Sequence, residues 1–89
     1  MVTAFILIGT KKGTGTLTAE ALTQVDGVAE VHITAGGLDL LAVIRVKTHE
    51  QLAEIVTGCM PKMENIERTQ TMISFKGFSR HNLEKLFST

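Results

Sequence analysis

The fold of this chain is organised around one segment, Thr34-Ala35-Gly36-Gly37-Leu38-Asp39-Leu40-Leu41-Ala42-Val43-Ile44-Arg45-Val46. Its two adjacent glycines separate an apolar run from an earlier run, residues 28–34, that is also rich in β-branched residues. Because glycine adopts positive φ angles without steric cost, a short glycine turn between two such runs predicts a β-hairpin. The sequence therefore predicts one strand at 28–34 and a second at about 38–46.

One acid, Asp39, stands between the glycine turn and the apolar strand, and two interpretations are open. Aspartate is common in turns, where its carboxylate accepts hydrogen bonds from backbone N–H groups. The same carboxylate can instead bind an ammonium group. The threonine hydroxyls of Thr69 and Thr71 both donate and accept, and backbone N–H groups at a glycine turn can meet a carboxylate. Together these groups suit a zwitterion, that is, a free amino acid.

The remaining elements follow from hydrophobic periodicity. An apolar strand is expected at 2–8, a helix from Thr16 or Thr18 to about residue 25, and a second helix after residue 48. A fourth strand is expected at 65–76, followed by a short helix that starts at Ser79. The order β-α-β-β-α-β with a terminal helix predicts an α+β, ferredoxin-like fold.

Two strands are expected to carry apolar residues on both faces. In the first, Phe5 and Leu7 alternate with Ala4, Ile6 and Ile8, and in the third, Leu41 and Val43 alternate with their apolar neighbours. One layer of helices covers only one face of a sheet, so the other face needs a partner. We therefore expect a dimer packed sheet to sheet, an α/β sandwich, which can associate further into a ring.

The two helices are each expected to present one apolar side to the sheet. For the second, Thr48 and Gln51 form a capping box, and Cys59 falls on the apolar side, where it is expected to be buried. For the first, the residues that repeat every fourth position are Leu17, Ala21 and Val25.

Length and charge exclude several classes of protein. The 89 residues are expected to form one domain, 1–89, and nine basic residues balance nine acidic ones. Without a basic cluster, direct binding of nucleic acid is not expected. One cysteine makes no internal disulfide, and the apolar run at 2–8 is too short for a membrane span. We therefore expect a soluble cytoplasmic protein without a membrane or nucleic-acid partner.

No constellation for catalysis or metal binding can be read from the sequence. The histidines His32, His49 and His81 fall in three different elements, and none has a partner at metal-ligand spacing. No nucleophile and base can be paired either, so no catalytic residue, metal or cofactor is predicted. A binding module fits better than an enzyme. The alternatives are a small dimeric α/β-barrel enzyme of the monooxygenase or isomerase type and a purely structural oligomerisation module.

Three segments together resemble a known family. Residues 25–31, residues 36–41 and residues 66–73 are similar, in order and spacing, to the effector-binding domain of the Lrp/AsnC transcription regulators, also called the RAM domain. The family pattern is a glycine two residues before an aromatic-Asp pair. Here Gly36 and Asp39 match the pattern, whereas Leu38 replaces the aromatic residue. The size and preference of the side-chain pocket are therefore not implied by the resemblance.

The resemblance implies a non-catalytic domain that binds free amino acids or similar small effectors and modulates transcription regulators of amino acid metabolism. It implies dimers that assemble into rings, commonly octamers or decamers, with effectors held between dimers. Members usually carry an N-terminal helix-turn-helix, whereas this chain begins at its first strand, so the stand-alone form is expected, with full-length Lrp/AsnC regulators as further partners. The effector-binding residues that the resemblance implies are Gly36, Gly37, Leu38, Asp39, Thr69 and Thr71.

Overall fold

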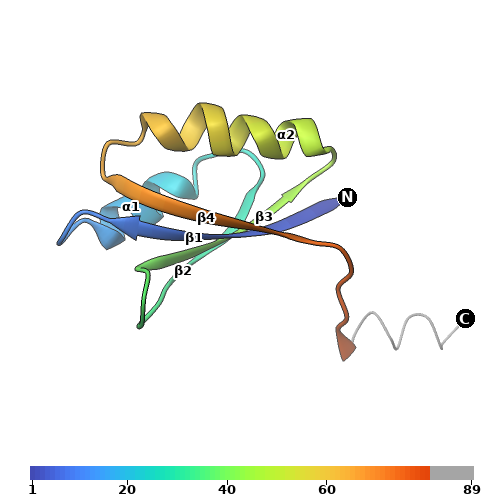
Figure 1. Ribbon diagram of the computed structural model, residues 1–89, viewed down its shortest axis with the longest axis horizontal. Helices are drawn as coiled ribbons and strands as arrows, with labels where there is room; N and C mark the ends of the chain where they lie inside the picture. Colours follow the sequence, from blue (N-terminus) through green and yellow to red (C-terminus); the bar gives the residue numbers. More distant parts are fainter. Residues whose placement is uncertain (81–89) are drawn as a thin grey trace, which may run out of the picture.

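A four-stranded antiparallel sheet forms the centre of the molecule (Figure 1). The computed structural model describes residues 1–80. The strand order across the sheet is β2-β3-β1-β4, so the first and third strands occupy the middle. The four strands are β1 (Val2–Thr10), β2 (Val28–Ile33), β3 (Leu40–Val46) and β4 (Ile66–Ser74).

The helices complete the predicted order, and the ferredoxin-like α+β fold is confirmed. Helix α1 (Gly15–Leu22) joins β1 to β2, and α2 (His49–Glu54) follows β3. A π-helical turn (Ile55–Cys59) and a 3-10 turn (Met60–Lys62) continue α2 toward β4. The expected C-terminal helix, which would begin at Ser79, falls almost entirely outside the described residues. Within residues 1–80, no helix is both long and apolar enough to cross a membrane.

The core lies between the helices and one face of the sheet. Residues directly opposite each other in an antiparallel pair share a face, so Ile6 of β1 lies on the same face as Ala42 of β3. The residues of this face and those of the helices form one cluster. Six of its sheet residues have no exposed surface: Ala4, Ile6, Ile8, Leu40, Ala42 and Ile44. The alternation predicted for β1 and β3 is therefore confirmed.

The side of α1 that faces this core differs from the predicted one. Thr18 and Leu22 are the buried residues of α1, whereas Leu17 is 64% exposed and Ala21 is also exposed. The spacing of Leu17, Ala21 and Val25 fitted a helix that would run to residue 25. The helix ends at Leu22, and Val25 packs on the core from the segment beyond it. Because Val25 lies beyond the end of the helix, its spacing from Leu17 and Ala21 does not identify the side of α1 that faces the core.

The start of α2 is as predicted, whereas the predicted burial of Cys59 is wrong. The hydroxyl of Thr48 accepts from the backbone N–H of Gln51, and the Gln51 side chain accepts from the backbone N–H of Thr48, which completes the capping box. Further along, the N–H of Met60 donates to Ile55, five residues back, as in a π-helix. This wider turn rotates the following residues, so Met60 is buried at 2% exposure and Cys59 is exposed, contrary to prediction.

Among residues 1–80, no helix covers the other face of the sheet, called here the open face. Strand register assigns to it Phe5 and Leu7 of β1, Leu41 and Val43 of β3, and Met72 of β4. Of these, Val43 is nearly buried at 6% exposure, and Met72 is 44% exposed. An apolar stripe therefore crosses the sheet on the side away from the helices.

Candidate functional site

A loop of six residues, 34–39, joins β2 to β3 at one end of the sheet. Strand β3 begins at Leu40 rather than at Leu38, so the predicted tight turn is in fact a wider loop. Gly36 has a φ of 128°, a value that favours glycine. Two hydrogen bonds close the base of the loop. The Thr34 N–H donates to the Asp39 carbonyl at 2.9 Å, and the Thr34 hydroxyl donates to the Leu38 carbonyl at 2.8 Å.

The side chain of Asp39 fastens this loop to the end of β1. Its Oδ2 accepts a hydrogen bond from the backbone N–H of Thr10 at 2.8 Å and from the Thr10 hydroxyl at 3.2 Å. The register between β1 and β4 shifts at Gly9 and Thr10, which marks a bulge where the regular ladder is interrupted. Asp39 therefore satisfies a backbone donor at an irregular strand end, as the turn interpretation of this acid predicts.

A hollow of about 590 Å³ opens on the open face beside this loop. Its floor follows one row of the sheet, in which Leu7 lies between Leu41 of β3 and Gln70 of β4. Its volume falls within the range of roughly 300–1,000 Å³ that is typical of small-molecule sites. We call it the loop hollow, and its lining residues are Leu7, Thr34, Ala35, Gly37, Leu38, Leu41, Arg68, Thr69 and Gln70.

The predicted site residues fall into two groups around the loop hollow. Gly37, Leu38 and Thr69 line it, although Thr69 lies opposite the buried Ile8, so register assigns its side chain to the helix-covered face. Asp39 and Gly36 belong to the same loop but are not among the lining residues. Thr71 lies opposite the buried Ile6, so register assigns its side chain to the helix-covered face, away from the hollow.

Arg68 is the charged residue of this hollow, and it is among the lining residues that sequence reasoning missed. It lies opposite Gly9 across the β1–β4 pair, and its Nη2 donates to the carbonyl oxygen of Gly37 at 3.2 Å. A β-carbon on Gly9 would lie 2.9 Å from both Cγ and Nε of Arg68, so the side chain passes directly over the glycine. The glycine at the end of an apolar strand was the available signal, because a glycine in a strand often marks a close approach.

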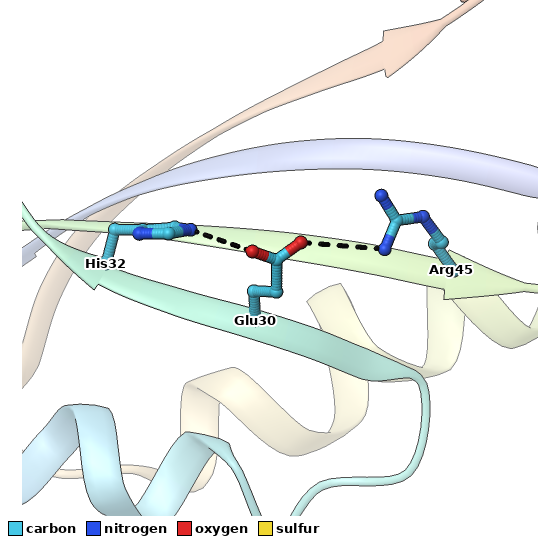
Figure 2. Close-up of polar contacts among 3 residues, drawn as sticks. All are labelled: Glu30, His32 and Arg45. Carbon is cyan, nitrogen blue, oxygen red and sulfur yellow. Dashed lines mark hydrogen bonds and ion pairs between the residues drawn. The ribbon is translucent and has the colours of Figure 1, made fainter. Parts of the chain in front are cut away.

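A second charged group lies further along the open face, across β2 and β3 (Figure 2). Glu30 lies there between the imidazole of His32 and the guanidinium of Arg45. Its Oε1 is 3.1 Å from Nε2 of His32, and its Oε2 is 3.7 Å from Nη1 of Arg45. The three side chains are about half exposed, so each pair contributes at most about 1 kcal/mol to stability. The charge of Arg45 is therefore matched within the chain.

A search for clustered metal ligands gives no candidate centre. Among residues 1–80, no group of three or more histidine, cysteine, aspartate or glutamate side chains could hold a metal ion. The loop hollow combines apolar walls with a few polar groups, a combination expected of a small-molecule site.

Fold and sequence comparison together define the class of protein. The fold is that of a ferredoxin-like α+β domain, and residues 3–83 match the family model described as the Lrp/AsnC ligand binding domain. The chain therefore belongs to the Lrp/AsnC ligand-binding domain family, a regulatory domain found in transcription regulators.

Individual relatives agree with this assignment. The chain is 37% identical over 76 residues to the uncharacterized HTH-type transcriptional regulator PH1916 of Pyrococcus horikoshii, a match that covers 82% of this chain and 51% of that protein. The crystal structure of TTHA0845 from Thermus thermophilus superposes with a TM-score of 0.83 at 36% identity, covering 90% of this chain and 100% of that one. The chain spans about half the length of the curated relatives it matches.

The fold also occurs in more distant structures. The transcriptional regulator NMB0573/L-Met complex from Neisseria meningitidis matches with a TM-score of 0.76 at 15% identity, covering 89% of this chain and 53% of that one. At this identity the likeness concerns the fold alone.

Proposed function

We propose that this chain is a non-catalytic sensor domain that binds a free amino acid, or a similar small effector, in the loop hollow. The observation that carries the proposal is that the hollow is already formed and that its loop is held from two sides. Asp39 fastens the loop to Thr10 of β1, and Arg68 of β4 bonds to Gly37. A site that needs little rearrangement loses little free energy to ordering when a ligand binds.

The comparisons support this proposal at the level of the family. The family is a ligand-binding domain of transcription regulators, and one regulator of the same fold, NMB0573, is in complex with L-Met. A protein of similar extent to this chain exists as the whole of the TTHA0845 structure. We therefore propose that this domain acts in the cytoplasm, where it modulates Lrp/AsnC regulators of amino acid metabolism.

The proposed contacts within one chain are those that line the hollow, Gly37, Leu38 and Thr69. Gly36 gives the loop its turn, and Asp39 holds the loop in place through its hydrogen bonds to Thr10, without itself lining the hollow. Thr71, on the helix-covered face of the edge strand β4, would contact an effector only at a boundary with a second copy.

Self-association is the second part of the proposal. The apolar stripe of the open face runs through Phe5, Val43 and Met72, and these residues are not covered by a helix. Packing two such faces together would remove the stripe from water, which favours a sheet-to-sheet dimer. The dimers would then associate into a ring, such as an octamer or decamer.

Thermal unfolding in the presence of each common amino acid tests the effector-binding proposal. Because the chain has no tryptophan or tyrosine, circular dichroism is the suitable signal. An effector at about one hundred times its Kd stabilises the folded state by about 2.7 kcal/mol. Asp39→Ala is expected to reduce this ligand-dependent gain, because the loop loses its attachment to Thr10. Asp26→Ala, an exposed aspartate outside the hollow, serves as the control and should keep the gain.

The outcomes also separate the alternative functions. A gain in stability with one or a few amino acids supports the sensor. No gain with any amino acid, together with assembly that is independent of every ligand, contradicts the sensor and favours the structural oligomerisation module. Steady turnover of a substrate that disappears on changing His32 or Asp39 would instead favour the dimeric α/β-barrel enzyme.

A further inference from the structure

The charge of Arg68 is not matched by an acidic partner in the described chain. Among residues 1–80, the side chains of Glu30, His32 and Arg45 form the ion pairs, and Arg68 takes part in none of them. Its one hydrogen bond, from Nη2 to the carbonyl of Gly37, uses a single donor. A guanidinium group has five N–H donors and remains charged at any physiological pH. Most of the donors of Arg68 are therefore available to a ligand.

The position of this guanidinium is set by the backbone around it. Gly9, directly beneath it, lacks the β-carbon that would lie 2.9 Å from Cγ and Nε of Arg68 and 3.3 Å from Cδ2 of Leu38. The side chain of Arg68 therefore lies across β1 toward the loop, where the Gly37 carbonyl accepts a hydrogen bond from its Nη2. An arginine held in this way loses less conformational entropy when it binds an anion than a free surface arginine does.

The rest of the hollow is apolar or neutral. Leu7, Leu38 and Leu41 contribute apolar walls, and Thr34 and Gln70 contribute neutral polar groups. Arg68 is the one charged residue among those that line the hollow. The nearest acid of the loop, Asp39, directs Oδ2 to Thr10 and does not line the hollow. A single cation above an apolar floor is complementary to an anion with an apolar tail.

We propose that Arg68 binds the carboxylate of a small monocarboxylic acid whose apolar side chain packs on the leucines of the loop hollow. This inference rests on the proposed function and specifies its ligand class. Arginine binds carboxylates through two parallel hydrogen bonds, which adds geometric selection to charge. Recognition thus depends chiefly on the carboxylate, and the α-ammonium group contributes less. The 2-oxo acids of apolar amino acids are therefore ligands as well as the amino acids themselves.

Isothermal titration of the full chain with matched ligands tests this inference. The ligands are valine, leucine, isoleucine, methionine and phenylalanine, the 2-oxo acid of each, and the amine that each amino acid gives when its carboxylate is removed. We expect at least one amino acid and its 2-oxo acid to bind with Kd values within about tenfold of each other, and the corresponding amine not to bind. Hydrogen bonds to charged groups contribute about 1.5–3 kcal/mol, so Arg68→Gln should weaken both acids by at least about tenfold.

Two further variants test whether binding depends on the paired donors of Arg68 and on its position. Arg68→Lys keeps the charge but loses the paired donors, so it should bind the acids with intermediate affinity. Arg80→Gln removes the same charge from an exposed arginine that does not line the hollow, and it should bind as the unaltered protein does. Since Arg68 is itself exposed, Arg68→Gln is expected to fold, and the ligand series on the unaltered protein tests the inference without any variant.

The failure of this inference can be distinguished from the failure of the proposed function. Binding of an amine with no binding of the 2-oxo acid would overturn the role of the carboxylate while the sensor function remained. The same holds if only polar amino acids bind, or if Arg68→Gln binds as tightly as the unaltered protein. If no amino acid of any kind and no 2-oxo acid binds, the proposed function fails and this inference fails with it.

Discussion

The carboxylate of Asp39 and the backbone of Thr10 are joined by a hydrogen bond of 2.8 Å between Oδ2 and N. Thr10 is the last residue of β1, and Asp39 is the last residue of the loop that precedes β3. Figure 1 shows this loop at the end of the sheet where β1 ends. Because the loop borders the hollow, this contact links the geometry of the candidate site to the end of a central strand.

Removing this link should destabilise the fold by a measurable amount. Thr10 is only 9% exposed, so Asp39→Ala leaves its N–H poorly satisfied, which costs about 1–3 kcal/mol. Thr10→Val removes only the longer hydroxyl contact and should cost less, about 0.5–1.5 kcal/mol. Urea unfolding at one fixed protein concentration gives both values. Equal stability of Asp39→Ala and the unaltered protein would show that the link contributes nothing.

A side chain at position 9 should impair ligand binding more than folding. In Gly9→Ala the new methyl group would meet Arg68 at 2.9 Å, and the exposed arginine can move away into solvent. We therefore expect the affinity for carboxylic acids to fall at least about tenfold, as for loss of a charged hydrogen bond. Gly58→Ala is the matched control, because a β-carbon there meets nothing within 4 Å. Unchanged affinity in Gly9→Ala would contradict the positioning of Arg68.

The side of α1 that faces the core can be tested with two leucines. Leu22 has no exposed surface, so Leu22→Ala should destabilise the protein by about 2–5 kcal/mol. Leu17 is 64% exposed, and Leu17→Ala should change the free energy of unfolding by no more than about 0.5 kcal/mol. The two variants are compared by urea unfolding. A larger loss in Leu17→Ala would restore the orientation predicted from the sequence.

The proposed dimer predicts that a charge on the open face disrupts association. Phe5 lies in the apolar stripe. In a dimer, Phe5→Glu would place one carboxylate from each copy in the apolar boundary between the sheets, where unpaired charges are costly. Sedimentation velocity should then show a smaller species than for the unaltered protein. Phe75→Glu, at a fully exposed phenylalanine beyond the end of β4, is the control. The same sedimentation coefficient for both variants and the unaltered protein would argue against the sheet-to-sheet dimer.

Local signals in the sequence predicted the strands and the start of α2 well. The strands β1 and β3 are recognised from apolar residues at every second position, a pattern within one short segment. The capping box of Thr48 and Gln51 is recognised from four consecutive residues. The orientation of α1 and the burial of Cys59 were wrong because both depend on where a helix ends or widens. The π-helical turn at Ile55–Cys59 was not foreseen from the spacing of apolar residues, which assumes a regular α-helix.

The candidate site was predictable only in part, for a different reason. The loop and Asp39 are contiguous in sequence, so their importance could be read from Gly36 and the apolar run that follows. The position of Arg68 depends on the register between β1 and β4, which sets it opposite Gly9 and separates it from Thr71. The register between two strands is fixed only when the chain folds, so the sequence of β4 alone does not show which residue of β1 lies opposite Arg68.

The central claim, that a small effector occupies the loop hollow, is tested most directly by backbone amide chemical shifts recorded during titration with the amino acid that stabilises the protein. We predict that the largest changes occur at Gly37, Leu38 and Thr69, with little change at Gln51 and Glu54, which border a different hollow at the far end of the molecule. Changes that centre on Gln51 and Glu54, while Gly37, Leu38 and Thr69 stay constant, would contradict the account.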